Sequence, residues 1–210
     1  MTNGSSELVT NIANGITTLM LNNILMDLAG ANGVASITII LYAQSILVSF
    51  YYGFMMGISP LISFNYGKQE HQRLKKINKI SLIIVGSISL ITLLIAVVFS
   101  KNLVNLFLDN SSGNQEVLDM ATYGFIIFAI SFLFMGFNIY ASSFFTALNN
   151  GLISALISFL RTFGFMVLFI IVLPLFFNLD GVWISIPLAE FFTFIIALPC
   201  LIIYKKHYHY

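Results

Sequence analysis

The feature that most constrains this chain is a long uncharged stretch that ends abruptly at a basic cluster. From Leu28 to Gly67 no residue carries a charge, and Lys68 is the first of five basic residues within twelve positions. A helix needs about 20 consecutive apolar residues to cross the hydrocarbon core of a bilayer. A basic cluster in a short loop marks the cytoplasmic side of a membrane. The stretch therefore predicts membrane-spanning helices that lead into a cytoplasmic loop.

Composition extends this prediction to the whole chain. Of the 210 residues, 59% are hydrophobic and only 8% are charged, whereas soluble domains are about 25% charged. The single cysteine, Cys200, excludes an intramolecular disulfide. The chain is therefore expected to be an integral membrane protein whose lipid contacts come from its apolar side chains.

Apolar segments separated by polar loops divide the chain into six expected spans, which together form one domain over residues 1–210. The predicted fold class is all-α, an integral membrane six-helix bundle. The expected spans cover about 8–26, 34–64, 80–99, 118–147, 152–175 and 182–204.

The placement of basic residues predicts the orientation. With both termini in the cytoplasm, seven basic residues fall in inner loops or the tail, and only Lys101 falls outside. Such an asymmetry is typical of a fixed topology. A seven-span alternative, which splits the second segment, would place the tail lysines outside. The seven inner residues are Lys68, Arg73, Lys75, Lys76, Lys79, Lys205 and Lys206.

The second span carries a small-residue motif and a proline. Gly53 and Gly57 form a GxxxG pair, which Ser45 and Ser49 extend at the same spacing. Small residues at this spacing allow two membrane helices to approach closely. We therefore expect a helix-packing seam here, followed by a kink at Pro60, which lacks the backbone N–H donor.

The first span carries a stripe of polar side chains. At about 100° per residue, its members fall within an arc of roughly 80°. Lipid cannot satisfy such a stripe, so it faces either a water-filled cavity or hydrogen-bonding partners on another helix. The cavity reading makes these residues candidates for a substrate path. They are Glu7, Asn11, Asn14, Thr18 and Asn22.

A weaker stripe on the fourth span has the same two readings. It combines small and polar residues, and Asn138 is the amide within it that we include among the candidate cavity-lining residues. A close-packing seam would explain the small residues equally well.

Two charges lie deep in the last two spans. Arg161 is expected roughly 15 Å from the inner end of its helix and Glu190 roughly 21 Å, at the helical rise per residue. Charges in a membrane are costly unless they are paired. The two residues are therefore predicted to form an ion pair, with either a structural role or a role in transport or proton relay.

Motifs for other kinds of chemistry do not occur in the sequence. There is no Gly-rich phosphate loop, HExxH or GxSxG motif, and the histidines lack metal-ligand spacing. We therefore expect no enzyme activity, no metal site and no cofactor. Nucleic acid is not an expected partner, because membrane topology alone accounts for the basic loop.

Two stretches resemble a known transporter family. PLISFNYGKQEHQRLKK is similar to the loop after the eighth helix of MATE (multidrug and toxic compound extrusion) transporters. The last two spans resemble that family's final helices in Arg161, Pro174, the turn from Leu179 to Trp183, and Glu190. The resemblance covers essentially the whole chain, as the carboxyl-terminal lobe of a twelve-helix fold.

This resemblance implies a fold and a function. Family members are built from two six-helix lobes that face each other across a cavity, and they export organic cations and drugs in exchange for H⁺ or Na⁺. An amino-terminal six-helix lobe is the implied partner, and the plasma membrane is the implied location. Some members use a carboxylate in the fourth helix of this lobe as a cation site, where this chain offers Asn138. Proton coupling through a carboxylate of the other lobe is the alternative.

Two other functions stay open at this point. A lipid-linked oligosaccharide flippase of the same superfamily would need cations in its cavity to hold pyrophosphate, and Arg161 is the one expected there. The start MTNGSSELVT reads like the middle of a loop, so an inactive fragment of a truncated or split gene is the second alternative.

Overall fold

The structure is a computed structural model that describes residues 2–108, 115–208 and 210, with side chains from residue 12 onward. Its elements are all helical within these ranges. They are α1 (Thr2–Gly67), α2 (His71–Val98), α3 (Ser100–Asn105), α4 (Gln115–Ala129), α5 (Phe132–Ala147), α6 (Gly151–Phe159), the π-helical turn η1 (Leu160–Gly164), α7 (Phe165–Ile203) and α8 (Lys205–Tyr208).

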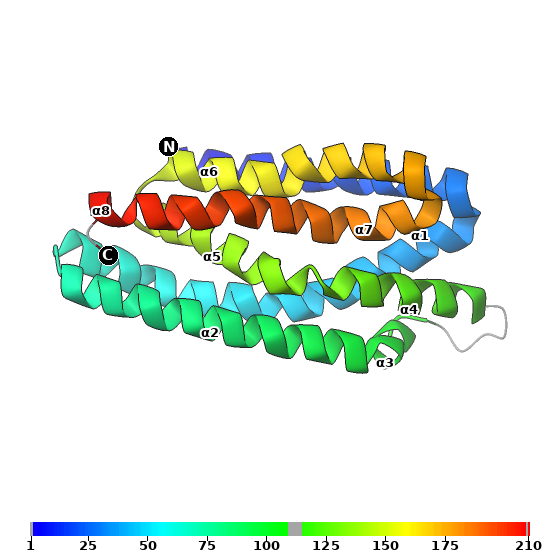
Figure 1. Cartoon of the computed structure of the whole chain (residues 1–210), viewed down its shortest axis with the longest axis horizontal. Helices are drawn as coiled ribbons and strands as arrows, with labels where there is room; N and C mark the ends of the chain where they lie inside the picture. Colours follow the sequence, from blue (N-terminus) through cyan, green and yellow to red (C-terminus); the bar gives the residue numbers. More distant parts are fainter. Residues whose placement is uncertain (1, 109–114, 209) are drawn as a thin grey trace.

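The two longest helices each double back on themselves (Figure 1). Helix α1 crosses the bundle twice, whereas α7 completes the crossing that α6 and η1 begin and then crosses back. The reversal in α1 is at Gly30 (φ 63°), a backbone conformation that glycine adopts without steric cost. The reversal in α7 is at Asn178 (φ 49°), and asparagine tolerates positive φ better than most residues. A Cβ on Gly181 would lie 2.5 Å from the Leu173 carbonyl, so the two halves of α7 pack backbone to backbone here.

Because of these two reversals, fewer than six long helical stretches can still cross the membrane six times. Three helical stretches are long and apolar enough to span a membrane, and the bent α4–α5 pair makes a fourth. Two of the three stretches, Ile12–Gly67 and Gly151–Tyr208, contain the reversals and so supply two passes each. The described residues therefore form an all-α six-helix membrane bundle.

The fourth pass is broken, although the sequence predicts one continuous helix over 118–147. Helices α4 and α5 meet at an angle of 55° at Ile130 and Ser131. No proline is present at this point. Instead, the buried Tyr51 hydroxyl contacts the Thr92 hydroxyl at 2.7 Å and donates to the Phe132 carbonyl at 3.1 Å. A hydrogen bond from another helix thus satisfies a backbone carbonyl group at the break.

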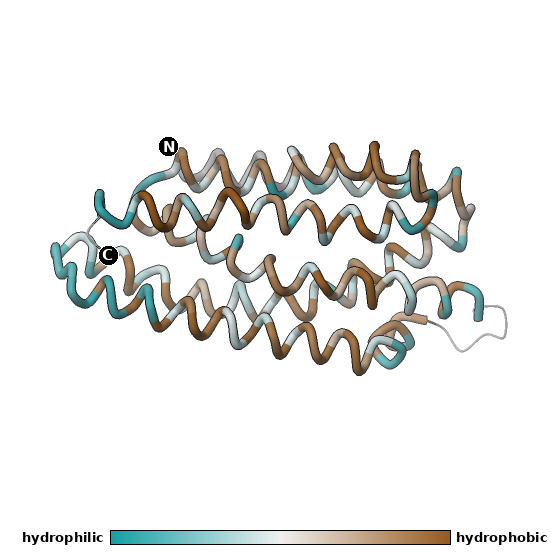
Figure 2. The backbone as a smooth tube through the Cα atoms, in the orientation of Figure 1, coloured by the Kyte–Doolittle hydropathy of each residue, from teal (hydrophilic) through white to brown (hydrophobic). Residues whose placement is uncertain are grey.

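The ends of the bundle are polar and its middle is apolar (Figure 2). The start of α1, the α1–α2 turn and α8 lie at one end, and α3 lies at the other (Figure 1). The basic cluster is mostly helical rather than a loop, because α2 begins at His71 and contains Lys75 to Lys79. Basic residues therefore gather at one end of the bundle, opposite the end that holds Lys101.

Helix α5 lies at the centre of the bundle, where it contacts α1, α2, α6 and α7. Its buried aromatic residues, including Phe132 and Phe144, join Tyr51 and Trp183 in the core. Gly124 of α4 permits this packing, since a Cβ there would lie 2.8 Å from the Trp183 ring. This arrangement places the polar residues of α5 beside α6, η1 and the second half of α7.

Candidate functional site: a polar cleft around Arg161

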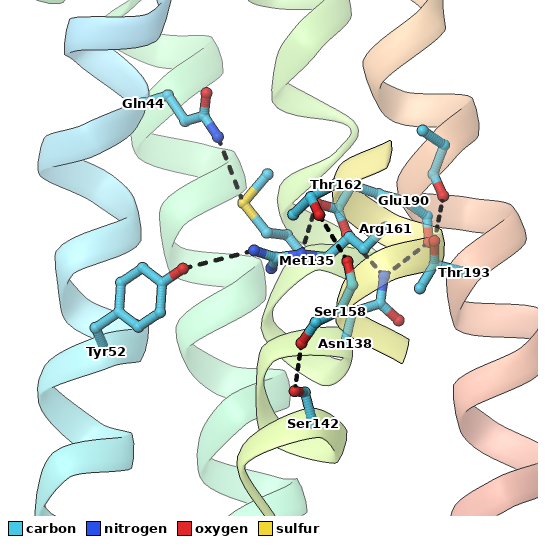
Figure 3. A network of polar contacts seen from close by, with 11 residues as sticks. Gln44, Tyr52, Met135, Asn138, Ser142, Ser158, Arg161, Thr162, Glu190 and Thr193 are labelled. Carbon is cyan, nitrogen blue, oxygen red and sulfur yellow. Dashed lines mark hydrogen bonds and ion pairs between the residues drawn. The ribbon is translucent and has the colours of Figure 1, made fainter. Parts of the chain in front are cut away.

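Arg161 lies in the π-helical turn η1, between α6 and α7. Single π turns interrupt the regular helical hydrogen bonding and occur frequently at functional sites. The Thr162 hydroxyl donates to the Ser158 carbonyl at 2.8 Å, which satisfies one backbone acceptor beside the interruption. The turn presents the Arg161 guanidinium toward the middle of the bundle (Figure 3).

The structure brings Arg161 and Glu190 together. The Arg161 Nε atom lies 3.9 Å from Oε1 of Glu190, which is 6% exposed on the second half of α7. The fully buried Asn138 amide donates to the other Glu190 carboxylate oxygen at 2.7 Å and to the Glu190 carbonyl at 2.8 Å. Asn138 therefore fixes the carboxylate that faces the arginine.

Tyr52 of α1 approaches the guanidinium from the opposite side. Its hydroxyl lies 3.5 Å from the Arg161 Nη2 atom, and the side chain is exposed. About two helical turns before Tyr52 on α1, the Gln44 amide reaches the Met135 sulfur at 3.9 Å. Figure 3 shows Tyr52 and Gln44 on one helix, both directed toward this network. Arg161 thus links α1 to α7, and Asn138 of α5 joins this network through Glu190.

A cavity of about 830 Å³ lies on one side of Arg161. Its lining includes the exposed residues Asn14, Tyr52 and Met56, so the cavity opens at the outside of the lobe. Hydroxyl groups of α5 and α6 form one wall. The Ser142 hydroxyl lies 2.7 Å from that of Ser158 and 3.0 Å from that of Ser154, and Thr146 lies 2.6 Å from Ser154.

A second cavity, of about 340 Å³, lies on the other side of Arg161. Asn14, Tyr52 and Arg161 line both cavities. Glu190 lines only the smaller one, together with Thr18 and side chains of α1 and α5. The two cavities therefore form one polar cleft that Arg161 divides. Such a cleft can hold and orient a polar solute, and the described residues provide no catalytic constellation in it.

The polar stripe of the first span divides in the structure. Asn14 lines both cavities and Thr18 lines the smaller one. Asn22 lines neither, and its side-chain oxygen is buried without a hydrogen-bond partner among the described residues. The side chains of Glu7 and Asn11 lie outside the described residues. Of the described side chains in the stripe, Asn14 and Thr18 therefore line the cleft and Asn22 does not.

The predicted packing seam at Gly53 and Gly57 is not used within the described residues. A Cβ at either position would meet nothing within 4 Å. The reason is helical phase, because Tyr51 occupies the buried face of α1 and Gly53 lies about 200° further round. Pro60 lines the larger cavity, and helical dihedral angles continue through it, with Gly30 the one non-helical residue within α1.

Several cleft residues are absent from the sequence-based set. Tyr52 is one of three tyrosines in an aromatic-rich span, so no pattern distinguishes it. Ser154 and Ser158 follow each other at a spacing of four residues on α6, which is a signal that a search for polar faces would find. The cleft therefore combines residues from spans that sequence patterns examine one at a time.

Comparison with known proteins identifies the family. The family model described as MatE matches residues 7–172. The chain belongs to the MATE family. A curated relative, "Uncharacterized protein MG447" of Mycoplasma genitalium, is 29% identical over 147 residues, which are 70% of this chain and 25% of that protein.

Solved MATE structures share the fold at low identity. "Crystal structure of MATE in complex with MaL6" aligns with a TM-score of 0.91 at 18% identity, over 99% of this chain and 46% of that one. A MOP superfamily transporter from Pyrococcus furiosus, described by "reverse polarity of binding pocket", aligns with a TM-score of 0.90 at 18% identity, over 99% and 46%. The chain therefore has the fold of one lobe and spans about half the length of the solved MATE structures.

Proposed function

We propose that this chain is one lobe of a cation-coupled antiporter that exports small organic cations, including drugs, across the plasma membrane. The second lobe would be an amino-terminal six-helix unit of the same family. Transport would proceed by alternating movement of one lobe against the other around a site near the middle of the membrane.

The observation that carries this proposal is the cleft shared by Asn14, Tyr52 and Arg161. Polar and charged groups inside a membrane bundle are costly and mark solute or ion pathways. Here they line cavities that include the exposed side chains of Asn14 and Tyr52 at the outside of the lobe. A facing lobe would close such a cleft into a central cavity.

The coupling ion is proposed to be H⁺ or Na⁺. In the described part of the cleft, Glu190 is the carboxylate, and Asn138 and Arg161 hold it. A carboxylate of the first lobe would add a second group that can bind the coupling ion. Both termini and the basic end of the bundle are proposed to face the cytoplasm, because basic residues concentrate on that side of membranes.

A lipid-linked oligosaccharide flippase is the second candidate, and Arg161 is the observation that favours it, as a cation in a hydroxyl-lined cavity. One arginine provides less charge than a pyrophosphate would need, so the antiporter remains the main proposal. An inactive membrane fragment is the third candidate.

Dye efflux tests the main proposal. Cells that lack their own exporters would co-express the chain with an amino-terminal MATE lobe, be loaded with ethidium, and be followed by fluorescence. We expect efflux that stops either when an uncoupler collapses the proton gradient or when sodium is removed. Efflux that survives both treatments would exclude cation coupling, and no efflux from a well-expressed pair would contradict the transporter proposal.

A further inference from the structure

Arg161 is the charged side chain that both cavities share. Among the described residues that line the larger cavity, Arg161 alone is charged, and the others are hydroxyl, amide or apolar side chains. Glu190 reaches only the smaller cavity. A solute in the larger cavity therefore meets a positive charge in this lobe.

The hydrogen-bonding capacity of Arg161 is mostly unused within the described residues. A guanidinium has five N–H donors in a planar fork. The Nε–Glu190 distance of 3.9 Å is an ion pair that is too long for a hydrogen bond, and the Nη2–Tyr52 distance of 3.5 Å is at the outer limit. Nη1 is buried and has no partner among the side chains that the structure describes. Unmet donors on a charged group are costly, so a ligand that accepts these hydrogen bonds gains free energy.

The carboxylate of Glu190 does not fill this role. Its Oε2 atom already accepts a hydrogen bond from Asn138 at 2.7 Å, and the same amide also holds the Glu190 backbone at 2.8 Å. Glu190 is therefore fixed on α7 at ion-pair distance from Arg161. The outer edge of the guanidinium remains available, with the Tyr52 hydroxyl directed toward it (Figure 3).

The wall of the larger cavity adds further donors. The hydroxyls of Ser142 and Ser158 lie 2.7 Å apart, and either can be the donor of that pair. Each hydroxyl has one proton and can rotate, so the serine that does not donate within the pair can donate to a ligand oxygen. An arginine beside a hydroxyl cluster is a favourable setting for a planar or tetrahedral anionic group.

We propose that Arg161, with Tyr52 and the Ser142–Ser158 pair, binds a carboxylate or phosphate group of the solute in the larger cavity. This inference rests on the proposed transport function and narrows its substrate class. The preferred solutes would be organic cations that also carry an anionic group, and purely cationic molecules such as ethidium would still be exported but would bind more weakly. The donors belong to this chain, so the site exists without the other lobe.

A matched pair of dyes tests the site directly. Rhodamine 110 carries a free carboxylate, and rhodamine 123 is its methyl ester and a simple cation. Binding of each dye to the purified chain in phosphatidylcholine nanodiscs would be followed by fluorescence anisotropy. We expect rhodamine 110 to bind at least about tenfold more tightly, the size of a charge-assisted hydrogen bond, and benzoate to displace it.

Variants assign the preference to Arg161 and separate its loss from misfolding. Glu190→Gln removes the competing carboxylate and should strengthen rhodamine 110 binding. The double variant Arg161→Gln/Glu190→Gln leaves no unpaired charge and should make the two dyes equal. Lys101→Gln, on α3 at the far end of the bundle, removes one positive charge outside the cleft and should leave the preference unchanged.

A second membrane composition distinguishes the sources of the anionic group. If phosphatidylglycerol in the nanodisc displaces rhodamine 110 from the wild-type chain but has no effect on the double variant, the group is a lipid phosphate. If the dye stays bound, the group belongs to a soluble solute.

Equal binding of both dyes by the wild-type chain would overturn the inference. So would no binding of rhodamine 110 up to millimolar concentration, or a preference that survives the double variant. Ethidium efflux by the two-lobe pair would stand in each of these cases, so this failure is distinct from failure of the transport proposal.

Discussion

The Nε atom of Arg161 lies 3.9 Å from Oε1 of Glu190, across the gap between the π-helical turn η1 and the second half of α7. The reversal at Asn178 allows the two side chains to approach, because it returns the second half of α7 alongside its first half. Two charges that are 29 residues apart in sequence (190 minus 161) therefore meet inside the bundle.

The pair predicts a coupled effect on stability. Arg161→Gln or Glu190→Gln alone leaves one uncompensated buried charge, which costs about 3–5 kcal/mol in soluble interiors. The double variant should recover much of that loss. Thermal unfolding in detergent measures all four members of the cycle, and strictly additive losses would show that the two side chains do not interact.

The close approach of the two halves of α7 predicts a sensitive glycine. In Gly181→Ala the new Cβ would lie 2.5 Å from the Leu173 backbone, so backbone has to move, and overpacking of this kind costs about 1–3 kcal/mol. Gly57→Ala is the matched control, since its Cβ would meet nothing within 4 Å. Thermal unfolding of both variants tests this. Equal melting temperatures would argue against the close contact.

Basic residues at one end of the bundle predict its sidedness. Single cysteines at Gln72 and Gln115, in a Cys200→Ser background, lie at opposite ends of the bundle on exposed positions. An impermeant thiol reagent applied to intact cells should label the cysteine at 115 and spare the one at 72, until the membrane is permeabilised. The reverse pattern would invert the proposed topology.

The cleft predicts a difference between two asparagines of α1. Asn14 lines both cavities, whereas the exposed Asn23 lines neither. In the two-lobe pair, Asn14→Leu should lower the ethidium efflux rate several-fold, and Asn23→Leu should leave it near the wild-type rate. Membrane expression of both variants is the control. Equal rates at equal expression would remove Asn14 from the solute path.

Sequence patterns predict the membrane bundle well because hydropathy and charge act locally. The uncharged stretch before Lys68 and the polar loops suffice for the all-α membrane fold, and the motif around Asn65 to Lys68 resembles the family that the comparison identifies. The deep charges Arg161 and Glu190 stand out because ionised side chains are rare in apolar spans.

Tertiary features are what the sequence patterns miss. The break between α4 and α5 has no proline to signal it, and Tyr51 stabilises it from another helix. Gly53 and Gly57 match a packing motif, yet the phase of α1 turns them to the outside. Tyr52 enters the cleft only because α1 and η1 are neighbours in space. Each of these depends on contacts between spans.

The proposal that the chain is half of a transporter is tested most directly by ethidium efflux from cells that express it alone. Under this proposal the chain supplies only one wall of a central cavity, so efflux should match that of cells with an empty vector. Co-expression of an amino-terminal MATE lobe should raise the rate well above this background. Robust efflux by the chain alone would contradict this account and would indicate a self-associating six-helix carrier.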